Sequence, residues 1–96
     1  MLEPEYTPRF NRDVKRLKKK RIDAAPLRQV IRLILDNTIE SIEELKRRHN
    51  MHTLLGEWRG SNECHVANAG DWLLIWCTTD DLAIFQRTGS HDELFG

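Results

Sequence analysis

The stretch that decides the fold is Trp72-Leu73-Leu74-Ile75-Trp76-Cys77. Successive side chains of a strand point to opposite faces, and here both faces are apolar. Such a strand belongs in the centre of a sheet, with helices over one face and other apolar groups over the second. We therefore expect a central strand at residues 72–78.

Two further strands are expected beside it. Residues 58–66 precede the central strand, with a turn at residues 67–70, and residues 82–87 follow it after Thr79-Asp80-Asp81. Short apolar runs bounded by turn residues are typical of an antiparallel meander. The second half of the chain thus predicts a small antiparallel sheet.

The first half of the chain begins with a strand and a helix. Residues 2–6 predict a short strand, and Pro4 favours an edge position because proline donates no backbone hydrogen bond. Thr7-Pro8 predicts a helix start, since the hydroxyl caps the first turn and proline fits its first position. Apolar residues then recur at helical spacing, at Phe10, Val14 and Leu17.

A second helix is expected at about residues 24–36, with its buried side provided by Leu27, Val30, Ile31, Ile34 and Leu35. Ser41-Ile42-Glu43-Glu44 has the spacing of a capping box, which predicts a short third helix ending at residue 48. Residues 1–96 are thus expected to form a single α+β domain. We expect the N-terminal strand and two helices, together with the short third helix, to pack on a small antiparallel β-sheet.

The bulk composition excludes several classes of protein. The 96 residues, 40% hydrophobic and 31% charged, suffice for one small core. Residues 72–77 are the longest apolar run, far shorter than the roughly 20 residues that span a bilayer. The N-terminus lacks the regions of a signal peptide, so we expect a cytoplasmic protein with no membrane partner. Cys64 and Cys77 are then expected to stay reduced rather than to pair.

The zero net charge of the chain hides a division between its halves. Residues 1–50 carry 13 Lys and Arg against 8 Asp and Glu, a net +5, whereas residues 51–96 carry 2 against 7, a net −5. Most of the positive excess lies between residues 9 and 21 and includes Lys18, Lys19 and Lys20. Such a cluster is either a solvated helix face or a surface that binds phosphates.

The second half of the chain carries the residue types that cleave RNA without a metal ion. This reaction needs a base for the 2′-hydroxyl proton, an acid for the leaving 5′-oxygen and a cation for the charge on phosphorus. Histidine, with an ordinary pKa of about 6.5, suits the proton roles. Arginine grips two phosphate oxygens, and aromatic rings stack on single-stranded bases. The candidates are His52, His65, Asp71, Arg87, His91, Trp72 and Phe95.

Other interpretations of these residues stay open. A lone histidine is usually a surface or core residue, Trp72 fits a core, and Phe95 fits a plug on the sheet. Asp71 fits a turn, and Arg87 fits a surface ion pair with Asp80 or Asp81. A metal site built from the histidines and Asp71 lacks a compact ligand spacing, so we expect neither a metal nor a cofactor. The residues alone favour an acid–base site, for which RNA is one candidate substrate.

Three segments resemble the YafQ-like branch of the RelE/ParE superfamily, the bacterial toxins of type II toxin–antitoxin pairs. The first, at residues 52–60, is similar to that branch's His-x-Leu-x-Gly-x-Trp-Lys/Arg-Gly. The second is Glu63-Cys64-His65-Val66 followed by Asp71-Trp72-Leu73-Leu74-Ile75, and the third is Arg87-Thr88-Gly89-Ser90-His91-Asp92-Glu93-Leu94-Phe95. Thr7-Pro8-Arg9-Phe10, with Asp13 and the basic run, matches as well.

The resemblance implies a RelE-like fold and a ribosome-dependent endoribonuclease that cuts translated mRNA. The implied partners are the ribosome, mRNA and an antitoxin, which forms a heterodimer or heterotetramer with the toxin. The motifs place active residues at His52, His65, Asp71, His91 and Phe95, with Arg87 facing the scissile phosphate. His52 is preferred to the nearby His49 because only His52 stands four residues before the glycine of Gly-x-Trp.

Two other functions compete with this hypothesis. One is a toxin-fold binding module that blocks a ribosomal or gyrase-like target without cleaving RNA, and the other is a metal-dependent nuclease. The histidines favour cleavage, since a pure binder has no need of them around one cleft. We expect His91 to be the general acid, exposed after a Gly-Ser turn, and His52 and His65, assisted by Asp71, to supply the base.

Overall fold

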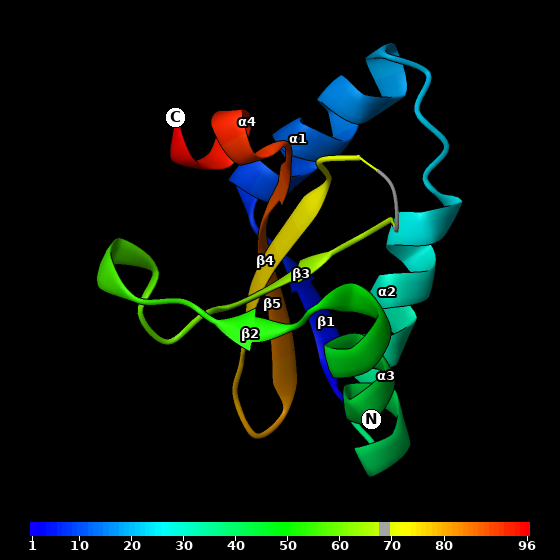
Figure 1. Cartoon of the computed structure of the whole chain (residues 1–96), viewed down its shortest axis with the longest axis vertical. Coiled ribbons are helices and arrows are strands. Elements are labelled where there is room, and N and C mark those ends of the chain that lie inside the picture. Colours follow the sequence, from blue (N-terminus) through cyan, green and yellow to red (C-terminus); the bar gives the residue numbers. More distant parts are fainter. Residues whose placement is uncertain (68–69) are drawn as a thin grey trace.

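One mixed sheet organises the molecule. A computed structural model describes residues 1–67 and 70–96, and over these residues five strands pair in the order β1-β5-β4-β3-β2 (Figure 1). Their bounds are β1 Glu3–Tyr6, β2 His52–Thr53, β3 Asn62–His65, β4 Leu73–Thr78 and β5 Leu82–Gly89. The predicted α+β class is confirmed. The predicted antiparallel sheet is wrong in one respect, because β1 lies parallel to β5 while the other pairs are antiparallel.

Strand β4 is the central strand that the sequence predicts. The side chains of Leu73, Leu74, Ile75 and Trp76 are all buried, with at most 1% exposed. Strand β5 extends two residues beyond its predicted end, because Leu74 and Leu73 of β4 pair with Thr88 and Gly89. Strand β1 lies at one edge of the sheet, as predicted from Pro4.

The helices are α1 Pro8–Lys19, α2 Ala25–Asp36, α3 Ile39–His49 and α4 His91–Phe95. Thr7 caps α1 as predicted, since its hydroxyl accepts the backbone N–H of Phe10 at 3.1 Å. The third helix is confirmed, but the prediction that Ser41 caps it is wrong. Thr38 is the cap, and Ser41 completes the capping box three residues into the helix. In α2, Leu27, Val30 and Ile34 are buried, whereas Ile31 and Leu35 are only half-buried.

Two local predictions fail in the second half of the chain. The strand expected at residues 58–66 begins only at Asn62, because a 3₁₀ turn, η1 (Gly56–Trp58), precedes it. Gly56 and Gly60 have φ values of 70° and 92°, which interrupt a strand and favour glycine. The C-terminal helix α4 was missed, although Ser90 and Glu93 form its capping box. The turn predicted at residues 67–70 includes residues 68–69, which lie outside the described residues.

Apolar side chains cover both faces of the sheet, as the central strand required. The larger cluster joins α2 and α3 to one face and includes Leu27, Val30, Ile34, Leu45, Leu74, Trp76 and Phe85. On the opposite face, Leu73 and Ile75 pack with Leu94 of α4, and Leu54 and Trp58 border them. Figure 1 shows α2 and α3 together on one side, while α4 lies beside α1 at the other end.

Both cysteines are free in the structure, as expected for a reduced pair. Burial raises the pKa of Cys64 to about 12, with the nearby charge of Glu63 as a second cause. Within the described part of the chain, no helix has the length and apolar character needed to cross a membrane.

Thr88 provides a test of how β4 and β5 are held together. Its buried hydroxyl donates to the backbone oxygen of Leu73 at 2.8 Å and accepts the indole N–H of Trp72 at 2.9 Å. Thr88→Val should lower the free energy of unfolding by about 1–3 kcal/mol, because the backbone oxygen of Leu73 and the half-buried indole N–H of Trp72 lose their hydrogen bonds to Thr88. Urea unfolding measures the change, with the exposed Thr78→Val as the matched control. Equal stability of the two variants would contradict the assigned role.

Candidate active site

One row of the sheet brings distant candidate residues onto the same face. His52 of β2 opposes Glu63 of β3, Glu63 opposes Ile75 of β4, and Ile75 opposes Arg87 of β5. Directly opposed residues point to the same side of a sheet. Their side chains therefore share the face of the Leu73–Ile75–Leu94 cluster, away from α2 and α3. His65 joins them in the neighbouring row, opposite Leu73.

An irregularity in strand pairing determines where Arg87 lies. The register between β4 and β5 shifts between Ile75 and Trp76, so that Trp76 opposes Phe85 while Ile75 opposes Arg87. Gln86 is the extra residue at this bulge. Regular alternation would place Arg87 on the same face as Phe85, within the larger apolar cluster that packs against α2 and α3. The bulge instead directs Arg87 to the face that carries His52 and His65.

His52 lies at the exposed edge of this face. Its Nδ1 lies 2.9 Å from the backbone oxygen of Asn50, and its Nε2 lies 3.3 Å from Oε1 of Glu63. Glu63 is nearly buried, with 7% of its side chain exposed, whereas the His52 side chain is 46% exposed. An acceptor therefore faces each ring nitrogen, which fixes the orientation of the imidazole. Sequence reasoning did not include Glu63 among the candidates, although a carboxylate two residues before His65 in a buried strand was the available signal.

His91 and Phe95 lie on one side of α4, at the end of the same face. Their ring centroids are 5.0 Å apart, and the rings of Trp58 and Phe95 are nearly perpendicular, with a centroid distance of 6.4 Å. Both His91 and Phe95 are exposed. Asp71 was expected to assist His52 and His65, but its Oδ1 accepts the backbone N–H of His91 at 2.9 Å. Asp71 therefore positions the start of α4.

Trp72 and His49 have structural contacts. The indole of Trp72 is half-buried against the larger apolar cluster and donates a hydrogen bond to Thr88. Trp72 is therefore part of the core, which was one of the two interpretations of this residue in the sequence. His49 places its Nδ1 2.8 Å from the backbone oxygen of His65. Its contact is therefore with the backbone of β3, whereas His52 lies in the same row as Glu63 and Arg87.

Arg87 forms a buried ion pair with a residue from the other end of the chain. Its Nε and Nη2 lie 2.7 and 3.0 Å from the carboxylate of Asp13 on α1. The alternative pairing with Asp80 or Asp81 is therefore wrong. Burial raises the pKa of Asp13, but the hydrogen bonds from Arg87, Thr88 and Arg16 outweigh it and bring the pKa below its ordinary value. The same Asp13 hydrogen bonds raise the pKa of Arg87.

The basic end of α1 lies against α4. Nε of Arg16 is 2.8 Å from Oε2 of Glu93, an ion-pair distance without hydrogen-bond geometry, and Nζ of Lys20 is 3.5 Å from the same oxygen. Gly89 makes this approach possible: its φ is 154°, and a Cβ there would lie 2.8 Å from Glu93 Oε1. Lys18, Lys19 and Lys20 are exposed, so the basic surface adjoins the helix that carries His91.

The arrangement can support acid–base chemistry on a phosphodiester. His52 and His65 come from strands β2 and β3, His91 comes from α4, and the cationic Arg87 lies across Ile75 in the row of His52. Proton donors and acceptors on two sides of a cation are what phosphate transesterification requires. Among the described residues, no group of three His, Cys, Asp or Glu side chains is arranged to hold a metal ion.

Comparisons with known proteins show which family shares this sequence and fold. Residues 2–96 match the family described as "Bacterial toxin of type II toxin-antitoxin system, YafQ". The mRNA interferase toxin YafQ of Escherichia coli K12 is 37% identical over 92 residues, which cover 96% of this chain and 94% of the relative. The crystal structure of YafQ from E. coli BL21(DE3) has 34% identity and a TM-score of 0.85, covering 100% of both chains. YafQ in the E. coli DinJ–YafQ toxin–antitoxin complex has 36% identity and a TM-score of 0.83, covering 99% of this chain and 98% of that one.

The α+β fold and the complete match define the class first: this is a bacterial toxin of the type II toxin–antitoxin kind. Within that class, the chain belongs to the YafQ family. The predicted resemblance is thereby confirmed over nearly the whole chain.

Proposed function

We propose that this toxin is an endoribonuclease, an mRNA interferase that cuts translated mRNA on the ribosome by metal-independent acid–base chemistry. The mRNA interferase relatives, which the chain matches over 96% of its length, support the activity. The observation that supports the mechanism is the sheet face that carries His52, His65 and Arg87 and ends at His91.

The proposed reaction uses the two sides of this face for opposite proton transfers. On the β2–β3 side, His52 or His65 takes the proton of the 2′-hydroxyl, and the 2′-oxygen attacks phosphorus. On the α4 side, His91 gives a proton to the departing 5′-oxygen, which leaves a 2′,3′-cyclic phosphate and a 5′-hydroxyl. Arg87 stabilises the negative charge that builds on the phosphoryl oxygens.

Phe95 is the proposed platform for a base next to the cleaved bond. Phe95 is 41% exposed, and its ring packs nearly perpendicular to that of Trp58. A ring that is exposed yet held in one orientation stacks on a base with little loss of side-chain entropy, and such stacking contributes about 1–3 kcal/mol. Asp71 contributes by fixing the first turn of α4, so that His91 and Phe95 keep their relative positions.

The general-acid role of His91 is tested by His91→Ala, with the exposed Asp92→Asn of the same turn as control. Cleavage should slow roughly 10²–10⁴-fold, the usual contribution of a general acid. Mapped mRNA 5′ ends and bacterial growth after induction provide the measurement. Wild-type cleavage should also persist with a transition-metal chelator at constant Mg²⁺.

Each contrary result identifies a different error. Normal cleavage by His91→Ala rejects its role as acid. Loss of wild-type cleavage in the chelator supports a metal-dependent nuclease. Growth arrest with intact mRNA supports the alternative of a binding toxin.

The basic end of α1 is proposed to contact ribosomal RNA. Reversing Lys18, Lys19 and Lys20 to Glu should weaken ribosome association and flatten its dependence on salt, because fewer counterions are released. The fold should persist, since all three side chains are exposed. Sedimentation with ribosomes at several salt concentrations measures the effect, with Lys46, Arg47 and Arg48 of α3 reversed as the control. If both triple variants bind ribosomes equally well, the lysine cluster of α1 is a solvated helix face and not a binding surface for RNA.

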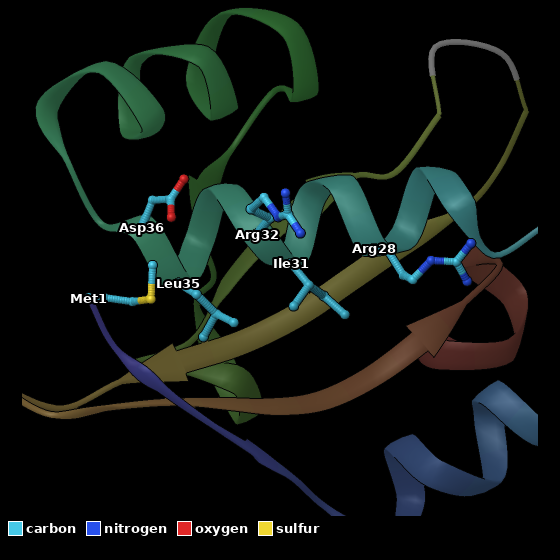
Figure 2. A pocket seen from close by; sticks show the side chains of 6 residues that line it. All are labelled: Met1, Arg28, Ile31, Arg32, Leu35 and Asp36. Carbon is cyan, nitrogen blue, oxygen red and sulfur yellow. The ribbon is translucent and has the colours of Figure 1, made fainter.

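An antitoxin is the proposed protein partner, as DinJ is for its toxin in the E. coli complex. A groove of about 570 Å³ runs along α2, where Ile31 and Leu35 provide an apolar floor and Arg28 and Arg32 lie beside it (Figure 2). Helix α2 covers the face of the sheet opposite to the one that carries His52, His65 and Arg87. Its apolar floor and basic margin suit an acidic amphipathic segment that orders on binding.

Reversal of Arg28 and Arg32 to Glu should weaken capture of the antitoxin encoded beside this toxin at least tenfold, mainly by slowing association. Binding kinetics with the purified antitoxin measure the effect, with Arg47→Glu and Arg48→Glu on α3 as a charge-matched control. Cleavage by the free toxin should be unaffected. If both double variants bind the antitoxin with equal affinity, the antitoxin does not bind in the groove along α2.

A further inference from the structure

The carboxylate of Asp13 is the most completely bonded polar group at the site. Oδ2 accepts Nε–H of Arg87 at 2.7 Å and the backbone N–H of Thr88 at 3.1 Å. Oδ1 accepts Nη2–H of Arg87 and Nη2–H of Arg16, both at 3.0 Å. Only 3% of the Asp13 side chain is exposed. Two of the four bonds hold a single partner, Arg87, and they hold it along one edge of its guanidinium.

The bonding leaves a defined part of Arg87 for a ligand. A guanidinium has five N–H donors in one plane, and Asp13 occupies one on Nε and one on Nη2. In the part of the chain that the structure describes, Arg87 has no other side-chain hydrogen bond. Both hydrogens of Nη1 and one of Nη2 therefore remain, and the Nη1/Nη2 edge presents two parallel donors. Two oxygens of a phosphate accept from an edge of this shape.

We propose that Asp13 is a positioning residue of the active site: it holds the Nε/Nη2 edge of Arg87 and so presents the Nη1/Nη2 edge to the scissile phosphate. The proposal rests on the proposed function for its kinetic part. Arg87 lies on a strand, but Asp13 lies on α1, which is the helix that carries the basic surface. The position of the basic helix and the orientation of the phosphate-binding arginine are thus set by one carboxylate.

A purely structural ion pair and a positioning residue predict different consequences. A structural carboxylate holds α1 against β5, and its loss lowers stability without a specific effect on turnover. A positioning carboxylate removes the rotational freedom of the guanidinium before substrate arrives, so its loss slows the chemical step more than it weakens binding. Lysine at position 87 keeps the ion pair with Asp13 but has no second pair of parallel donors to present to a phosphate. Removing the Asp13 carboxylate should therefore have little effect on the cleavage rate of the Arg87→Lys variant.

The kinetic test is a double-mutant cycle of Asp13→Asn and Arg87→Lys, with the exposed Asp80→Asn as a matched control for loss of charge. Asp13→Asn should lower the single-turnover cleavage rate on ribosome-bound mRNA roughly 10- to 100-fold, with half-saturation changed less than about twofold. In the Arg87→Lys background the same change should cost less than about threefold. Losses that multiply independently, or a folded Asp13→Asn with normal turnover, would overturn the proposal.

A second measurement uses the unmodified toxin and needs no cleavage. The Arg87 Nε–H should give one sharp nuclear magnetic resonance signal that exchanges slowly with water, and inorganic phosphate should shift the guanidinium signals of Arg87. In Asp13→Asn the Nε–H should exchange at the rate of exposed arginines, and the phosphate shift should shrink. Rapid exchange in the wild type overturns the proposal even if Asp13→Asn fails to fold. Protection and phosphate shifts in a toxin that cuts no mRNA would instead reject only the proposed function.

Discussion

A single buried carboxylate, that of Asp13, is the constraint on which the site depends. A charge that is 2% exposed is tolerated only when its oxygens are fully hydrogen-bonded, because an unpaired buried charge costs several kcal/mol. Its donors come from α1 itself and from two adjacent residues of β5, so the requirement fixes helix and strand relative to each other. The interaction thus acts less as a source of net stability than as a condition that selects one arrangement of α1, β5 and the residues that follow.

The bulge in β5 makes this arrangement useful. Without the bulge at Gln86, regular alternation would point Arg87 into the apolar layer beside Phe85, where its charge could not be satisfied. With it, Arg87 lies across Ile75 from Glu63 and His52, and its guanidinium reaches Asp13 at the edge of the sheet. Two residues later, Gly89 lets Glu93 approach Arg16, which brings α4 and His91 against α1. Small departures from regular strand geometry therefore assemble groups that regular alternation would separate.

The parts of the fold that depend on local chemistry could be predicted from the sequence. Apolar side chains on both faces identified β4 as central, and the Thr7-Pro8 pair identified the start of α1. The candidate residues of the site were chosen by their types and motifs, and the structure places His52, His65 and Arg87 on one face of the sheet, but their neighbours could not be predicted. The pairing of Asp13 with Arg87 spans 74 residues, and no local pattern encodes it. The bulge at Gln86 and the parallel pairing of β1 depend on the whole sheet, and for Trp72 the tertiary packing decided between core and surface.

The division of charge along the sequence acquires a different meaning in three dimensions. The basic first half and the acidic second half do not remain apart, because Glu93 lies beside Arg16 and Lys20, and Arg87 lies beside Asp13. Each cation near the site is thereby held by a carboxylate, yet the cluster of Asp13, Glu93, Arg16, Lys20 and Arg87 keeps an excess of one positive charge. At an ionic strength near 0.15 M, fields are screened beyond about 8 Å, so this excess acts only on a phosphate that is already close. The exposed lysines of α1 extend the positive surface beyond this cluster, so that a phosphate passing anywhere along it comes within reach of a cation. Under the proposed function, phosphate recognition is therefore divided between the exposed lysines of α1, which attract RNA, and the partly neutralised Arg87, which orients a single phosphate.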